Sequence, residues 1–320
     1  MHVCKATLGT LPLTVPTAVL ILDFDPLVRA GDASVRISTL VLAAVVAGAL
    51  LLAARIAATT PAHGPTPGPF AHRHHLRLDD LLFIVLGVVP GAVIGGRVEY
   101  VLTHLDYYVA TTGAIVDPGQ GGLGLGLAVV GGIASGAFVT RLLEAPIGRW
   151  AHVAALPTLL ALAGGRVAQV LSGDGQGQPT DLSWATSYVG PGPWGSLAPS
   201  LPSHPAQVYE AVLVAVVLVV LGAILAGGAF ASRDGRALAI AIGLWAIVRV
   251  AVAATWRDAP VWAGLNAAQV IAIAVAFGCA LVLVAGRSIA DRFERGAAGR
   301  QGVGDTLEPD WPDPATRPRF

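Results

Sequence analysis

Charged residues are scarce in this chain. Asp, Glu, Lys and Arg make up 12% of its 320 residues, whereas apolar residues make up 54% and the mean hydropathy is +0.68. Soluble domains carry about 25% charged residues, so the chain has too little polar surface for a water-soluble globule, and we expect an integral membrane protein. Twenty basic residues balance twenty acidic ones, which removes the electrostatic basis for binding nucleic acid.

Cysteine and methionine are nearly absent. Two cysteines, Cys4 and Cys279, cannot form a disulfide framework, and we interpret both as small buried or terminal thiols. With a single methionine, the apolar mass is mostly Ala, Val, Leu and Gly, which suits close packing of helices in lipid. His72, His74 and His75 lack the ligand spacing of a zinc site, so we expect a solvated loop and no metal there.

Long apolar runs, by contrast, are abundant. A helix needs about 20 mostly apolar residues to cross the hydrocarbon core. Pro90 would bend the second span by removing a helix hydrogen bond, and the many glycines of the third span indicate a close-packed face. We therefore predict an all-α integral membrane protein with seven transmembrane helices. The spans lie near 37–56, 81–103, 122–143, 151–172, 208–230, 237–256 and 265–286.

The distribution of basic residues predicts the orientation, because cytoplasmic loops are rich in Lys and Arg. The N-terminus is expected outside and the C-terminus in the cytoplasm. This divides the chain into an external segment 1–36, a membrane domain 37–286 with an ordered external arm 173–207, and a disordered cytoplasmic tail 287–320. The side taken as cytoplasmic holds Arg55, Arg73, Arg77, Arg141, Arg149, Arg233, Arg236, Arg287, Arg292, Arg295 and Arg300; the other holds Lys5, Arg29, Arg36 and Arg257.

Three arginines fall inside predicted spans, where a central charge costs about 2.5–3.5 kcal/mol. Arg97, Arg166 and Arg249 all follow the midpoints of spans that run in the same direction. We therefore expect their guanidinium groups at one depth, converging on a shared ligand. Guanidinium groups bind phosphate through a planar fork of donors, which favours an anionic lipid headgroup. Pairing with carboxylates, or snorkelling to the interface, stays open as the alternative.

The sequences around Arg97 and Arg166 are nearly identical, GGRVEYVL and GGRVAQVL. Tyr100 and Gln169 follow their arginines by three positions and so share the same helix face. Glu99 is two positions from Arg97 and is expected to point elsewhere. Because the two motifs lie in spans that cross the membrane in the same direction, they do not form the inverted repeat of many transporters.

The predicted fifth span opens with acid–base groups at the outer surface. His204 and Glu210 lie within the run SHPAQVYE, and Pro205 suits the first turn of a helix. Gln207 and Glu210 have a second interpretation, as side chains that satisfy the buried arginines in a structural network. The two interpretations are compatible, since a phosphate site needs such support.

These sequence motifs resemble those of the prolipoprotein diacylglyceryl transferase family. The most specific run is 165–177, GRVAQVLSGDGQG, which is similar to the family motif G-R-x-G-N-F-x-N-x-E-x-x-G. Residues 204–210, HPAQVYE, resemble H-P-[ST]-Q-x-Y-E, and residues 95–101 resemble G-[AG]-R-x-x-Y-V. Arg249 and Gln269 fall where the family has an arginine in the sixth span and a glutamine in the last. The resemblance extends over most of the chain.

The resemblance implies transfer of the diacylglyceryl group of phosphatidylglycerol to the lipobox cysteine of a prolipoprotein signal peptide, at the plasma membrane of a bacterium. A thioether forms, glycerol phosphate leaves, and no metal or cofactor is used. The partners would be phosphatidylglycerol, the precursor and membrane lipid, with no nucleic acid. The residues implied are Arg166, Arg97, Gln169 and Tyr100 for the lipid phosphate, Arg249 for the leaving group, His204 and Glu210 for acid–base chemistry, and Gln207, Asp174 and Gly177 as supports.

Several positions depart from the family pattern. A free thiol has a pKa near 8.5, so loss of the third-span histidine weakens thiol activation unless His204 or Glu210 replaces it. The phosphate-binding half of the site is retained, whereas the thiol-activating half is eroded. The departures are Gly126, Leu127 and Ala128 in place of H-G-G, Gln169 and Ser172 in place of asparagines, Asp174 and Ala253 in place of glutamates, and Ser38 in place of a tyrosine.

Two hypotheses stay open from the sequence. The first is a diacylglyceryl transferase with rearranged acid–base groups. The second is a catalytically silent paralogue that binds phosphatidylglycerol or lipoprotein precursors, which a second gene copy with the full motifs would favour. A transporter is disfavoured by the parallel repeat, and a membrane protease by the lack of an H-E-x-x-H pattern.

Overall fold

The computed structural model describes residues 19–62, 75–117 and 120–304. Within these ranges, seven helices are long and apolar enough to cross a membrane, which confirms the predicted spans. Their ends differ from the predicted ones by no more than about one helical turn, apart from the last helix. They are α1 (Ile37–Thr59), α2 (Leu78–Thr103), α4 (Leu125–Leu142), α5 (Ile147–Ser172), α6 (Ala206–Ala226), α7 (Arg236–Ala253) and the first part of α8 (Ala267–Gly304).

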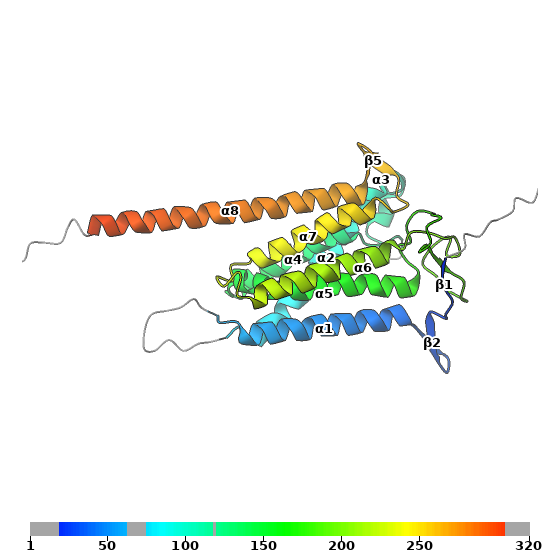
Figure 1. Cartoon of the computed structure of the whole chain (residues 1–320), viewed down its shortest axis with the longest axis horizontal. Coiled ribbons are helices and arrows are strands. Elements are labelled where there is room, and N and C mark those ends of the chain that lie inside the picture. Colours follow the sequence, from blue (N-terminus) through cyan, green and yellow to red (C-terminus); the bar gives the residue numbers. More distant parts are fainter. Residues whose placement is uncertain (1–18, 63–74, 118–119, 305–320) are drawn as a thin grey trace, which may run out of the picture.

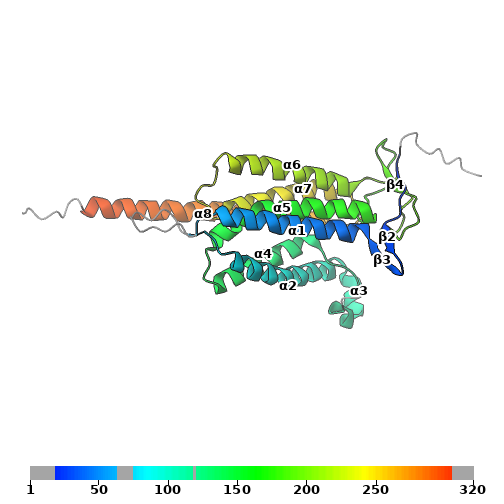
Figure 2. The ribbon, with the colours of Figure 1, turned by 90° about the horizontal axis from the view of Figure 1, so that it is seen from below.

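The seven helices run side by side along the long axis of the molecule (Figures 1 and 2). Helix α2 packs along α4, α1 along α5, and α7 along α8, while α5 also contacts α6 and α7. The short strands and α3 (Leu105–Ala110) gather at one end, which we call the arm end because residues 173–207 lie there. The last part of α8 projects from the opposite end (Figure 1).

The arm end also corrects the expectation of an entirely helical chain. Strand β1 (Leu20–Leu22) pairs in parallel with β4 (Thr186–Tyr188), which lies in the arm. Two antiparallel pairs join β2 (Leu27–Ala30) to β3 (Ala33–Arg36), and β5 (Pro260–Trp262) to β6 (Leu265–Asn266). Strands of two to four residues are too short to leave a periodic pattern, and the parallel pairing depends on tertiary contacts.

Two segments outside the predicted spans are helical. Helix α3 and the 3-10 turn η1 (Thr112–Ile115) occupy the stretch between the predicted second and third spans. Helix α8 continues past residue 286 to Gly304, so the expected tail of 287–320 begins as helix. Residues 305–320, together with Cys4, His72 and His74, lie outside the described residues.

Helices α2 and α4 touch through their backbones. A Cβ atom added at Gly131 would overlap the carbonyl oxygen of Gly91, and one at Gly95 would overlap the carbonyl oxygen of Leu127. Only glycine permits so close an approach. The prediction that glycines of the third span form a close-packed face is therefore confirmed. In α2, the absence of side chains at Gly95 and Gly96 lets α4 approach the backbone.

A buried core joins α5, α6 and α7. Leu159, Val214 and Trp245 are almost fully inaccessible and pack together with small alanines of α7. Large side chains locked in a close-packed interior hold their helices at fixed distances. The arm ends of these three helices, which carry the predicted site residues, are therefore held in a fixed arrangement.

Candidate functional site

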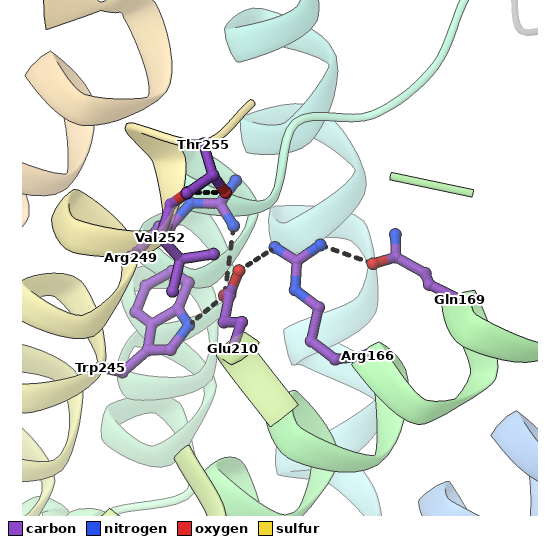
Figure 3. Close-up of polar contacts among 7 residues, drawn as sticks. All are labelled: Arg166, Gln169, Glu210, Trp245, Arg249, Val252 and Thr255. Atoms are coloured by element: carbon purple, nitrogen blue, oxygen red, sulfur yellow. Dashed lines mark hydrogen bonds and ion pairs between the residues drawn. The ribbon is translucent and has the colours of Figure 1, made fainter. Parts of the chain in front are cut away.

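Two of the three arginines that were expected to converge meet on one carboxylate (Figure 3). The Arg166 Nη2 atom of α5 lies 2.8 Å from Glu210 Oε2 of α6, and Arg249 Nη1 of α7 donates a hydrogen bond to Glu210 Oε1 at 3.4 Å. The Arg166 contact is an ion pair by distance, although its N–H bonds are not aligned as a hydrogen bond. The indole nitrogen of Trp245 donates to Glu210 Oε1 at 3.2 Å. These charged side chains are at most 9% exposed.

The cluster retains positive charge and unused donors. Two guanidinium groups and one carboxylate carry a net charge of +1, the opposite of a phosphodiester. Arg166 Nη1 donates to Gln169 Oε1 at 2.5 Å, as the predicted shared helix face requires, while its buried Nε atom has no acceptor within the described ranges. A guanidinium carries five N–H donors, and Glu210 is the one acceptor found for Arg249 in that part of the chain.

A tryptophan that follows α7 covers both arginines. The Arg249 Cζ atom lies 4.7 Å from the ring centroid of Trp256, and the Arg166 Cζ atom lies 5.5 Å from it. Cations within about 6 Å of an aromatic face are attracted to it. Trp256 therefore holds the two guanidinium groups side by side without using their N–H donors.

The arm holds this tryptophan in place. The amide nitrogen of Gln178 donates to the carbonyl of Thr255 at 2.7 Å, and its side chain donates to the carbonyl of Trp256 at 2.9 Å. Arg257 donates to the carbonyl of Gly177 at 2.7 Å and to Ser203 Oγ at 2.9 Å. The arm thus contacts the segment on which Trp256 stands and fixes its position.

The arginine pair opens into a large cavity. Its volume is about 880 Å³, and Arg166, Gln169, Asp174 and Arg249 line it with Trp256. Its remaining lining is mostly apolar and comes largely from the spans, including Leu42, Val93, Leu125 and Leu162. The cavity therefore combines a cationic end with an apolar interior, which is the chemistry of an anionic headgroup joined to acyl chains.

Three further titratable side chains, Glu99, His104 and Asp258, line the same cavity, and the sequence interpretation assigned none of them a role in the site. Glu99 of α2 is 3% exposed, and its Oε2 atom accepts a hydrogen bond from the amide of Leu127 at 2.5 Å. His104 stands just beyond α2, with its Nδ1 atom 2.9 Å from the carbonyl of Tyr100. Glu99 does point away from Arg97, as expected, but it points into the cavity.

Arg97 does not join the other two arginines, which corrects the expected convergence of three. Its guanidinium donates to the backbone carbonyls of Ala114, Ile115, Asp117 and Gln120 at 2.5–2.9 Å. It is not among the residues that line the cavity. Four carbonyls satisfy the charge, so Arg97 holds the α3–η1 segment over the end of α2.

Tyr100 likewise lies beside the site without entering it. Its ring stacks on that of His104, with centroids 4.2 Å apart. A Cβ atom added at Gly122 would lie 3.2 Å from the same ring. No contact with Arg97 is found among the described residues, and Tyr100 packs the segment that precedes α4.

His204 is placed in the arm and is not among the residues that line the cavity. Its Nδ1 atom lies 3.5 Å from the hydroxyl of Tyr209, and its carbonyl accepts a hydrogen bond from Gly177 at 2.8 Å. The structure therefore brings Glu210, but not His204, to the arginines. Glu210 itself is held by both of them, which corresponds to the structural interpretation of that residue.

The predicted supporting residues lie at the arm end. Asp174 lines the cavity and accepts a hydrogen bond from Ser172 Oγ at 2.7 Å. Gln207 is 2% exposed and lies beside Tyr188, whose hydroxyl donates to the carbonyl of Val170 at 2.9 Å. No group of three or more His, Cys, Asp or Glu residues that would hold a metal ion is found in the part of the chain that the structure describes.

A buried arginine pair at the head of a largely apolar cavity is the arrangement expected of a protein that handles an anionic lipid. The family model for prolipoprotein diacylglyceryl transferase matches residues 26–285. The chain belongs to that family. With seven candidate spans and bacterial relatives, it is a multi-pass protein of the inner membrane.

Several relatives carry the name phosphatidylglycerol–prolipoprotein diacylglyceryl transferase. The protein of Nitrobacter hamburgensis is 30% identical over 218 residues, which cover 66% of this chain and 72% of the relative. The protein of Clostridioides difficile is 27% identical over 203 residues, 63% of this chain and 77% of the relative. That of Solidesulfovibrio magneticus is 33% identical over 196 residues, 60% and 66% of the two chains.

Proposed function

We propose that this chain transfers the diacylglyceryl group of phosphatidylglycerol to the lipobox cysteine of a prolipoprotein. Membership of the family and the names of its relatives support the reaction. The observation that carries the proposal for this chain is the Arg166–Glu210–Arg249 cluster, which has a net charge of +1 and opens into the 880 Å³ cavity.

In this mechanism the cysteine sulfur attacks the diacylglyceryl carbon that is bonded to phosphate oxygen. The C–S bond forms as the C–O bond breaks, and the electron pair of that bond leaves on glycerol phosphate. Arg166, oriented by Gln169, holds the phosphate, and Arg249 stabilises the charge that grows on the leaving oxygen. Donors preorganised toward developing charge contribute most in a site that excludes water.

We place the arm end outside the cytoplasm and the end of α8 inside. The excess of arginine in the loops at the α8 end supports this orientation. The cavity head then faces the side on which the cysteine of a translocated signal peptide emerges. The acyl chains of the lipid would occupy the apolar part of the cavity, in the outer leaflet half.

The test is transfer of labelled diacylglyceryl from phosphatidylglycerol vesicles to a lipobox peptide by the purified protein. Arg166→Ala removes the charged hydrogen bonds to phosphate, each of which contributes about 1.5–3 kcal/mol, so transfer should fall at least tenfold. Arg141→Ala is the matched control. Arg141 is exposed in the last turn of α4, away from the arm end, so its loss should leave transfer unchanged.

The assay also separates the alternatives. Labelled peptide that depends on Arg166 supports the transferase. Phosphatidylglycerol binding that depends on Arg166, without any labelled peptide, would instead identify a silent paralogue. Equal transfer by the wild type and by Arg166→Ala would show that the arginine pair is structural and would contradict the proposed site.

A further inference from the structure

The thiol that attacks must lose its proton, and the groups expected to accept it are poorly placed. Glu210 is held by Arg166 and Arg249, which occupy both of its oxygens. His204 lies in the arm and does not line the cavity. Asp174 accepts the hydroxyl of Ser172. The reaction under Proposed function therefore needs another proton acceptor, and the present inference rests on that function.

Glu99 is a buried carboxylate that none of the observed contacts accounts for. It is 3% exposed, lies in a membrane-spanning helix and makes no ion pair within the described ranges. Its Oε2 atom accepts the amide of Leu127, in the first turn of α4, while no hydrogen bond to Oε1 is found there. Ionisable groups inside a membrane are costly and mark functional positions.

The surrounding helix is shaped to admit this carboxylate. A Cβ atom added at Gly124 would overlap the Glu99 side chain, and one at Gly126 would lie 3.1 Å from Glu99 Oε2. The Cβ atom at position 126 would also lie 2.7 Å from Ile271 Cγ2. The carboxylate of α2 and the side chain of Ile271 therefore both lie against position 126 of α4. Position 126 is where the resembled motif carries its histidine, so a titratable group is present there although it comes from another helix.

The geometry points to Glu99 as the general base that takes the proton from the lipobox thiol. Glu99 shares the cavity with Arg166 and Arg249, and a thiol beside cations ionises more readily. In the step, the S–H bond breaks and the proton passes to Oε1 of Glu99 as sulfur bonds to the diacylglyceryl carbon. The carboxylic acid then releases the proton to water, and glycerol phosphate departs with the electron pair of the broken C–O bond.

His104 and Asp258 are the rival acceptors, since both line the cavity. Both side chains are exposed at the arm end, where water reaches them, whereas Glu99 is enclosed. The Nδ1 atom of His104 is also engaged by the carbonyl of Tyr100. The experiment therefore includes variants of both.

The test compares Glu99→Gln with the wild type on two lipobox peptides, one with cysteine and one with selenocysteine, whose selenol is ionised at neutral pH without a base. Glutamine keeps the size of the side chain and an oxygen for the Leu127 amide. With the cysteine peptide, kcat should fall by about 100-fold or more, the usual contribution of a general base. With the selenocysteine peptide, kcat should stay within about threefold of the wild type, because no proton remains to be removed.

Glu144→Gln, a change of the same charge at an exposed position beyond α4, should behave as the wild type on both peptides. Equal losses of Glu99→Gln on both peptides would mean a structural or lipid-binding role and would overturn the inference. So would loss with the cysteine peptide in His104→Gln or Asp258→Asn while Glu99→Gln retains activity. Wild-type protein that labels neither peptide would contradict the proposed function itself, a result distinct from selective loss in the variant.

Discussion

At the scale of single residues, the molecule is organised by how each buried charge is satisfied. Glu210 neutralises one of the two arginines that face it, and the backbone carbonyls beyond α2 satisfy Arg97. Within the described ranges, a hydrogen bond is found to one oxygen of Glu99. The cluster thus holds one positive charge that Glu210 does not match, and the cavity wall carries the carboxylates of Glu99, Asp174 and Asp258. The proposed chemistry uses that positive charge and the carboxylate of Glu99.

Glu210→Gln should destabilise the protein strongly. Removing one partner of a buried ion pair leaves uncompensated charge and costs about 3–5 kcal/mol, and here two guanidinium groups lose their partner. We expect a clearly lower midpoint of thermal unfolding in detergent and loss of transfer activity. Glu144→Gln is the control. A midpoint equal to that of the wild type would show that the arginines are satisfied without Glu210.

Arg97→Ala should separate structure from lipid binding. Four hydrogen bonds from one guanidinium hold residues 114–117 and Gln120, so their loss should speed hydrogen exchange at those residues. Binding of phosphatidylglycerol should change by less than about threefold, whereas Arg166→Ala should weaken it about tenfold or more. A larger loss of lipid binding with Arg97→Ala would mean that Arg97 belongs to the phosphate site, which would contradict its structural role.

At the scale of elements, the sequence predicted the spanning helices, which the bilayer requires, but not the contacts between neighbouring helices. Span length and apolar content suffice to place the seven spanning helices, because lipid permits few alternatives. The two Gly-Gly-Arg motifs, however, predict similar surroundings for Arg97 and Arg166. Their surroundings differ because α2 faces α4 and the α3–η1 segment, whereas α5 faces α6 and α7. The position of Glu99 was missed for the same reason.

The α2–α4 contact gives a prediction at this scale. Gly131→Ala places a Cβ atom against the backbone of Gly91, so it should destabilise the protein by about 1–3 kcal/mol, as overpacking does. Gly278→Ala in α8 meets open space and should be neutral or stabilising, since alanine favours helix by about 0.5–1 kcal/mol. Thermal unfolding of both variants in one detergent measures the difference, and equal midpoints would contradict the close contact.

At the scale of the whole molecule, the arm joins strand β1 and the segment after α7 to the site. Strand β4 of the arm pairs with β1 near the N-terminus, while Gln178 and Arg257 fasten the arm to the segment after α7. Hydropathy does not reveal these contacts, because they depend on short backbone pairings between distant segments. The arm thereby stabilises Trp256 over both arginines.

Tyr188 gives this attachment a dependence on pH. Burial, together with the charge of Asp174, raises the pKa of Tyr188 to about 12, against about 10 in an unfolded chain. Between these values the unfolded chain has lost a proton that the folded arm retains, so stability is fully present below pH 10 and falls as pH rises toward 12. Limited proteolysis of the arm should accelerate over that range. Tyr188→Phe should lack the effect, and an unchanged profile in that variant would contradict the assignment.

The central claim is that Arg166 and Arg249 hold the phosphate of phosphatidylglycerol at the head of the cavity. An experimental structure of the protein with that lipid, using Glu99→Gln to slow turnover, tests it directly. We predict phosphate oxygens within hydrogen-bonding distance of both guanidinium groups and acyl chains along Leu42, Val93 and Leu162. A phosphate bound beside Arg97, or a lipid whose phosphate lies outside the cavity, would contradict the account.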